Sequence, residues 1–294
     1  MKFLNPKTDF AFKKIFGSEE SQDILLSFLN ALLGLETPYR LIEVTILDPY
    51  LAPKIRGMKD SYLDVRAKDE RGKSYIIEMQ VLNVAGFEKR ILYNACKAYA
   101  GQLGAGDNYH LLTDVIAITI TDFIMFPEME AISNRFKLRA DAGDVYNDDL
   151  ELIFAELPKF NKTEEELETV LDHWYYFLKH ADDLDAIPGS LNTEKPIAHA
   201  FELANKAALT PEELDDQERR EIFIQDQRGA IQLAKQRSRE EGLEEGREEG
   251  RKKGQEEERS KIVKQAKKSG MSVSEIATVF DMPAEEVERR LKEN

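Results

Sequence analysis

Two carboxylates and a carboxamide, at Asp64, Glu78 and Gln80, stand in consecutive segments that both have the alternating pattern of β-strands. Carboxylates that face each other across a sheet repel unless a cation neutralises them. Arg66, on the same predicted face, is one candidate cation. A divalent ion such as Mg²⁺ (or Mn²⁺) is the other, because Mg²⁺ prefers carboxylate oxygens and bridges to phosphate. The pattern therefore indicates either an incidental acidic pair on a solvated strand or a metal centre for phosphate chemistry.

The turn between these two strands predicts how they pair. Residues 69–73 read DERGK, and a three-residue loop at 70–72 with Gly72 at positive φ is a common hairpin connection. This loop predicts three pairs: Asp69 with Lys73, Asp64 with Glu78, and Tyr62 with Gln80. Because side chains alternate between faces, Glu78 and Gln80 share one face and Met79 points to the other.

The predicted elements around the hairpin follow the order α-β-β-β-α-β, which makes the chain an α/β protein. A helix is expected over 18–33, with Ser18 as its cap and Gly34 at its end. Strands are expected at 41–51, 61–68 and 73–82, a helix at 87–103, a central strand at 115–123, and further strands at 132–140 and 150–157. A helix over 163–180 begins with a capping box of Thr163 and Glu166.

The chain is expected to divide into four parts. Residues 1–160 form the core, 161–230 a helical extension, 231–268 a charged helical linker, and 269–294 a small helix-turn-helix-like module. In the linker, glycines recur every four residues, at Gly242, Gly246, Gly250 and Gly254. This spacing puts them on one helical face. The linker is therefore either a solvated, partly helical spacer or a self-association helix that would form a homodimer.

The last module reads KSGMSVSEIATVFDMPAEEVERRL, which has the pattern of two short helices around a turn. Ser272 or Ser274 is expected to cap the first helix. Four lysines precede the module, but Glu285, Glu286 and Glu288 lie on the helix that would read DNA, and they repel phosphate. A packing or assembly role is therefore favoured over DNA reading.

Composition narrows the function class. The 294 residues carry a net charge of −15, and residues 1–130 hold 15 basic and 18 acidic residues, so most of the excess lies later in the chain. An acidic chain does not bind nucleic acid through its charge alone. Cys96 is the only cysteine, so disulfide stapling within the chain is excluded. No signal peptide or membrane span is visible, and a cytoplasmic location is expected.

Several segments together resemble a known family. They are NPKTDFAFKKIFG at the start, the strands DSYLDV and IIEMQV, the segment FEKRILYNACKAYAGQLGAGDNY, the strand VIAITITDF, and the glycine-rich tail. In these the chain resembles the PD-(D/E)XK nuclease superfamily and, within it, the Rpn family of recombination-promoting, transposase-like nucleases. The resemblance implies a restriction-endonuclease-like α-β-β-β-α-β core with a mixed sheet. It also implies Mg²⁺- or Mn²⁺-dependent cleavage of DNA.

Carried over residue by residue, the resemblance makes Asp64 and Glu78 the metal ligands. Gln80 falls where the superfamily usually has a catalytic lysine; it can orient a water but brings no charge. Lys13 or Arg90 could supply that charge, and Asp9 is a further acidic candidate. The expected DNA contacts lie on one helix: Arg90, Tyr93 and Lys97. The alternative for Arg90 and Tyr93 is a packing contact of this helix.

Two functional hypotheses follow. The first is a metal-dependent DNA endonuclease, with a role in DNA recombination or mobile-element activity. The second is a catalytically inactive DNA-binding, regulatory or assembly protein on a nuclease fold, which the substitution of lysine by Gln80 makes credible.

Overall fold

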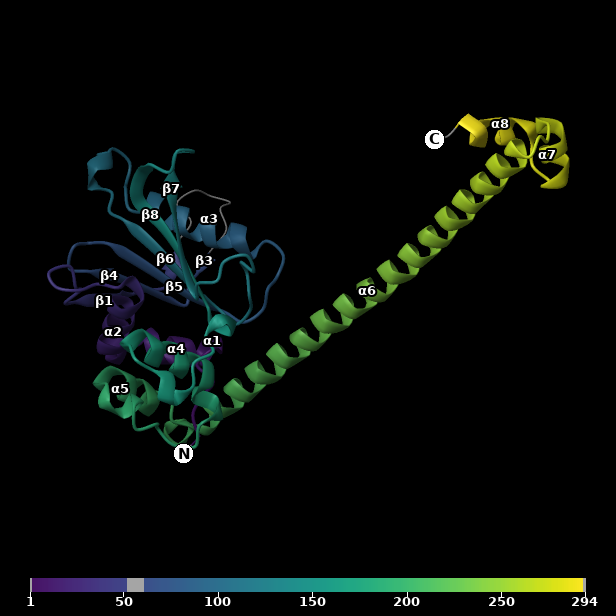
Figure 1. Cartoon of the computed structure of the whole chain (residues 1–294). Helices are drawn as coiled ribbons and strands as arrows, with labels where there is room; N and C mark the ends of the chain where they lie inside the picture. Colours follow the sequence, from purple (N-terminus) through teal and green to yellow (C-terminus); the bar gives the residue numbers. More distant parts are fainter. Residues whose placement is uncertain (1, 52–60, 293–294) are drawn as a thin grey trace. The chain divides into compact units, whose positions relative to one another are not determined.

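The computed structural model describes residues 2–51 and 61–292 of the chain. The chain divides into two compact units, Met1–Gln227 and Arg228–Asn294. The first unit holds the sheet and the helices packed on it, and the second holds the rest of the last long helix and two short helices (Figure 1). The mixed α/β fold expected from the sequence is confirmed.

A six-stranded mixed sheet forms the centre of the first unit, in the order β1-β4-β5-β6-β8-β7. The outer pairs are antiparallel, whereas β5, β6 and β8 run parallel to one another. The parallel pair β5–β6 is joined by helix α3, as such a crossover requires. The strand bounds are β1 Val44–Leu47, β4 Val65–Asp69, β5 Ser74–Gln80, β6 Val115–Thr121, β7 Ser133–Arg139 and β8 Val145–Glu156; β2 Tyr50–Leu51 and β3 Ser61–Tyr62 form a separate pair.

Two helices of the first unit, α1 and α4, begin at side-chain caps. Thr8 accepts a hydrogen bond at the start of α1, and Thr169 with Asp172 forms a capping box at the start of α4. The helix expected from Ser18 begins instead at Gln22, after a 3₁₀ turn, and the Ser18 side chain makes no capping bond. Gly34 ends this helix at φ 63°, as expected. The bounds are α1 Asp9–Phe16, α2 Gln22–Leu33, α3 Phe87–Ala100, α4 Val170–His180 and α5 Lys195–Leu203.

Helices cover both faces of the sheet (Figure 1). Helices α1, α2, α4 and α5 build the larger core with one face, where Trp174 is fully buried against Phe16 and Phe28. Helix α3 packs on the other face, where Ala95 lies in a smaller cluster with Ile76. The buried β6, with no exposed residue, fits its expected central place in the sheet.

The predicted hairpin register is confirmed. Gly72 has φ 84°, Asp69 N–H donates to the Lys73 carbonyl, and Val65 pairs with Ile77 in β4–β5. Continued by one residue, this register places Asp64 opposite Glu78. The predicted pair of Tyr62 with Gln80 is wrong, because the chain leaves the sheet before Val65 and Tyr62 pairs with Tyr50 in the separate β2–β3 ribbon.

Helix α6, Pro211–Lys268, includes the whole glycine-repeat segment. Among residues 2–51 and 61–292, a Cβ added at Gly242, Gly246, Gly250 or Gly254 would meet no atom within 4 Å, and self-association stays a prediction. In the second unit, α7 Val273–Val279 is capped by Ser272 through a capping box with Glu275, and α8 is Ala284–Lys292. Val263, Ala266, Ile276 and Val287 form its small core.

Within residues 2–51 and 61–292, no helix has both the length and the apolar character that a bilayer crossing requires.

Candidate functional site

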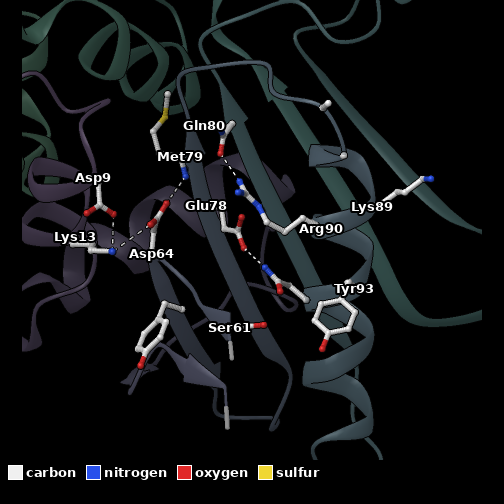
Figure 2. A pocket seen from close by; sticks show the side chains of 14 residues that line it. Asp9, Lys13, Ser61, Asp64, Glu78, Met79, Gln80, Lys89, Arg90 and Tyr93 are labelled. Carbon is white, nitrogen blue, oxygen red and sulfur yellow. Dashed lines mark hydrogen bonds and ion pairs between the residues drawn. The ribbon is translucent and has the colours of Figure 1, made fainter. Parts of the chain in front are cut away.

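A cavity of about 940 Å³ opens between α1, the start of β4, the end of β5 and the first turns of α3 (Figure 2). The structure brings most of the predicted site residues to it. The lining includes Asp9, Lys13, Asp64, Glu78, Gln80, Arg90 and Tyr93, together with Ser61, Tyr62, Met79, Lys89 and Asn94. Most of the site residues predicted from the sequence therefore lie in the walls of this cavity.

Asp64 lies one residue before β4 and is held from two sides. Its Oδ2 accepts a hydrogen bond from the Met79 backbone N–H at 2.9 Å, and its Oδ1 lies 3.5 Å from Lys13 Nζ. Burial raises the pKa of Asp64 to about 7; Asp9 also raises it, while the Met79 bond and Lys13 lower it. The Asp64 carboxylate is therefore held in one orientation. Its negative charge is only partly stabilised, because burial raises the pKa more than the Met79 bond and Lys13 lower it.

Glu78 lies within β5 and is buried beneath α3. Its Oε1 accepts a hydrogen bond from Asn94 Nδ2 at 2.9 Å. Burial raises the pKa of this carboxyl, while the Asn94 bond and the charge of Arg90 lower it. Asn94 was not among the predicted site residues, although its place four residues after Arg90 puts it on the same face of the predicted helix.

Gln80, at the end of β5, is hydrogen-bonded to the cationic side chain of Arg90. Arg90 Nη2 donates to Gln80 Oε1 at 2.7 Å, and Gln80 Nε2 donates to the Leu82 carbonyl at 2.8 Å. The Arg90 guanidinium also lies over the Phe87 ring, 5.4 Å from its centre. Both ends of the carboxamide are therefore fixed, and a positive charge stands beside it.

Lys13, on α1, is the cation that faces Asp64. Its Nζ lies 2.6 Å from Asp9 Oδ1, on the same helix, and between Asp9 and Asp64 in Figure 2. The opposite oxygen of Asp9 pairs with Arg220 of α6 at 2.6 Å, a residue for which the sequence offered no signal. Arg66, the alternative neutralising cation, donates instead to the Asp48 carbonyl at 3.4 Å.

The two remaining residues expected to contact DNA differ in position. Tyr93 lines the cavity and is partly exposed. Lys97 is buried, with Nζ 3.3 Å from Ser61 Oγ and 6.0 Å from the centre of the Tyr93 ring. Its amine therefore lies among protein groups, and its contact with DNA stays a prediction.

The donor set of the cavity fits a hydrated divalent cation. Among the residues that the structure describes, no group of three or more His, Cys, Asp or Glu forms a closed metal cage. Mg²⁺ does not need one, because it keeps several waters and binds through one or two carboxylates. Asp64 and Glu78 both face the cavity, and burial raises the pKa of both. A cation between them would favour their charged forms.

The fold agrees with a comparison against protein families. The model of the family described as PD-(D/E)XK nuclease family transposase matches residues 6–234. The chain belongs to this family, and the resemblance to PD-(D/E)XK nucleases is confirmed. The match spans the first unit and the start of the second. No curated protein and no solved structure matches the chain significantly.

Proposed function

We propose that this chain is a metal-dependent DNA endonuclease with Asp64 and Glu78 as the metal ligands. The observation that carries the proposal is the pair of carboxylates, both with a raised pKa, on the wall of one cavity. The membership of the chain in a nuclease family supports DNA as the substrate. Mg²⁺ or Mn²⁺ bound there would activate a water for attack and neutralise charge on the phosphate.

The chain's own residues would supply the remaining functions. Gln80 Oε1 accepts from Arg90 and keeps a second lone pair, which can accept a hydrogen bond from the attacking water. Arg90 keeps further N–H donors for a phosphate oxygen. Lys13 places one N–H toward Asp9 and one toward Asp64, and its third can reach a phosphate. Arg90 and Lys13 together bring the charge that Gln80 lacks.

Nicking of supercoiled plasmid DNA tests the proposal. Cleavage is expected with Mg²⁺ or Mn²⁺ and is expected to stop in EDTA. Asp64→Asn and Glu78→Gln are expected to slow it at least ~100-fold, which is about 2.7 kcal/mol of transition-state stabilisation. Asp141→Asn and Glu128→Gln, at exposed positions outside the cavity, are the matched controls. If the two site variants cut as fast as their controls, the assignment of the ligands is wrong.

A second candidate function rests on Gln80 itself. A neutral carboxamide at this position favours a DNA-binding or regulatory protein that has lost cleavage. This alternative predicts DNA affinity in a gel-shift assay with Ca²⁺, Mg²⁺ or Mn²⁺ but no cleavage with any of them. Cleavage by the parent that Asp64→Asn abolishes would exclude it.

A role in recombination or mobile-element activity builds on the same chemistry. Strand breaks are the substrate that DNA exchange requires, and the matched family is described as a transposase. We propose that the breaks made here start such exchange. A recombination reporter in cells that express the parent or Asp64→Asn tests this, and equal frequencies would overturn it.

A further inference from the structure

The first turns of α6 pack against α1, the helix that carries Lys13. Glu213 pairs with Lys14 at 3.0 Å, and Gln217 Oε1 accepts a hydrogen bond from Thr8 Oγ1 at 2.9 Å in a buried contact. Arg220 follows with its pair to Asp9. The spacing of four and then three residues puts Glu213, Gln217 and Arg220 on one face of α6.

The last of these contacts leads into the cavity through a row of alternating charges. Arg220 Nη1 lies 2.6 Å from Asp9 Oδ2, and Asp9 Oδ1 lies 2.6 Å from Lys13 Nζ. Lys13 Nζ is in turn 3.5 Å from Asp64 Oδ1. Arg220 is itself held by Asp216 on the preceding turn, at 2.9 Å from Nε. The row of charges therefore joins α6, α1 and the residue before β4, and it ends at Asp64, a proposed metal ligand.

The geometry of Asp9 explains what Arg220 contributes. Arg220 and Lys13 pair with different oxygens of the half-exposed Asp9 carboxylate, and Asp9 also interacts with the Asp64 side chain. Arg220 holds one oxygen, which turns the other toward Lys13. Lysine is a flexible chain with a compact charge, so its ammonium stays in one place only where several acceptors define that place. Asp9 and Asp64 are these acceptors for Lys13.

We propose that Arg220 is a positioning residue, which acts through Asp9 to hold Lys13 against Asp64 in the cavity. A purely structural role is a poorer account, because Glu213 and Gln217 already attach α6 to α1. The catalytic part of this inference rests on the proposed endonuclease function. The positioning of Lys13 does not, and it can be measured separately.

NMR of the full chain tests the positioning without any cleavage. The ¹³Cε signal of Lys13, assigned by its loss in Lys13→Met, is expected to move in Arg220→Gln. Arg219→Gln is the matched control, because Arg219 is the neighbouring arginine on the same helix and pairs with Asp215, four residues earlier. Its Lys13 signal is expected to stay in place. An unchanged Lys13 signal in folded Arg220→Gln would overturn the proposal.

Cleavage rates test whether positioning matters for the reaction. Arg220→Gln is expected to lower the single-turnover rate about 10-fold, as small displacements of a reacting group do. Arg220→Lys, which keeps the charge, is expected to recover most of this loss. In Lys13→Met the further change Arg220→Gln is expected to have no effect; additive losses would show that Arg220 does not act through Lys13. If the parent does not cleave DNA, the proposed function fails, while the NMR result still decides the role of Arg220.

Discussion

Arg90 donates a hydrogen bond of 2.7 Å to the side-chain oxygen of Gln80, so a cation from α3 stands at the end of β5, beside the residue that replaces a lysine in the proposed site. Glu78 lies two residues earlier on β5. Burial raises the pKa of its carboxyl, and the charge of Arg90 lowers it. In the proposed site, Gln80 of β5 and Arg90 of α3 would together serve the role that a single lysine usually serves.

The first prediction concerns Arg90. Arg90→Gln is expected to slow cleavage between roughly 10-fold and 1,000-fold, since a fixed donor to developing charge is worth that order. Single-turnover cleavage of supercoiled DNA measures the loss. Lys89→Gln is the control, because Lys89 lines the same cavity and the neighbouring position removes an equal charge. Equal rates for the two variants would show that Arg90 has no specific role.

The second prediction is a pH dependence of stability from Asp64. In the folded protein its pKa is raised to about 7, from an ordinary value of 3.8. Between these pH values the folded state holds a proton that the unfolded chain releases, so this group lowers the free energy of unfolding as pH rises through that window. Asp64→Asn is therefore expected to gain stability relative to the parent between pH 5 and pH 8.

Urea unfolding in EDTA at the two pH values measures this gain. Asp141→Asn, at an exposed position, is expected to show no such pH dependence. Mg²⁺ added at pH 8 is expected to stabilise the parent more than Asp64→Asn, because a ligand of the folded state alone shifts the equilibrium toward it. A difference between Asp64→Asn and the parent that stays constant from pH 5 to pH 8 would contradict the assignment.

The third prediction concerns Asn94, whose hydrogen bond lowers the pKa of Glu78. Asn94→Ala removes this bond, so the pKa of Glu78 is expected to rise further. A metal ligand must be deprotonated, so the acid side of the pH–rate profile is expected to move to higher pH. Leu92→Ala, on the exposed side of α3, serves as the control. An unmoved profile would separate Asn94 from the ionisation of Glu78.

The fourth prediction concerns the turn at Gly72. A Cβ there would lie in ordinary contact with Thr113 Cγ2, at 3.6 Å, so the cost of Gly72→Ala comes from its φ of 84°. The free energy of unfolding is expected to fall by about 1–2 kcal/mol. Gly242→Ala is the opposite case, since that glycine lies in helix α6 with open space around it. It is expected to stabilise the helix by about 0.5–1 kcal/mol. Urea unfolding of both variants measures the contrast, and a neutral Gly72→Ala would show that the turn tolerates a side chain.

Local patterns predicted the hairpin well because the information lay within a few residues. Gly72 set the turn, and the alternation along β5 put Glu78 and Gln80 on one face, as their hydrogen bonds with Asn94 and Arg90 of α3 bear out. The failure at Tyr62 has a physical reason. The prediction assumed one continuous strand from Ser61, whereas β3 and β4 are separate elements with different partners.

Contacts between distant parts of the sequence were out of reach. The pair of Asp9 with Arg220 joins residues 211 positions apart, and although Asp9 lies in the opening motif, no motif marks Arg220. Arg66 shares a predicted face with Asp64, which makes it a candidate cation from the sequence. The structure uses Lys13 instead, because α1 packs beside the sheet and brings its lysine to the start of β4. Such choices depend on tertiary packing, which the periodicity of a single segment does not contain.

The three-residue loop between β4 and β5 also limits how this gene can change. Because side chains alternate along β5, gaining or losing one codon in residues 70–72 would pair each strand one position out of step. Glu78 would then turn toward the apolar core or lose its place opposite Asp64. Most surface loops tolerate such length changes, but this one is expected to be intolerant of them. Mutational scanning with single-codon insertions is expected to show loss of function at residues 70–72, while insertions in other surface loops are tolerated.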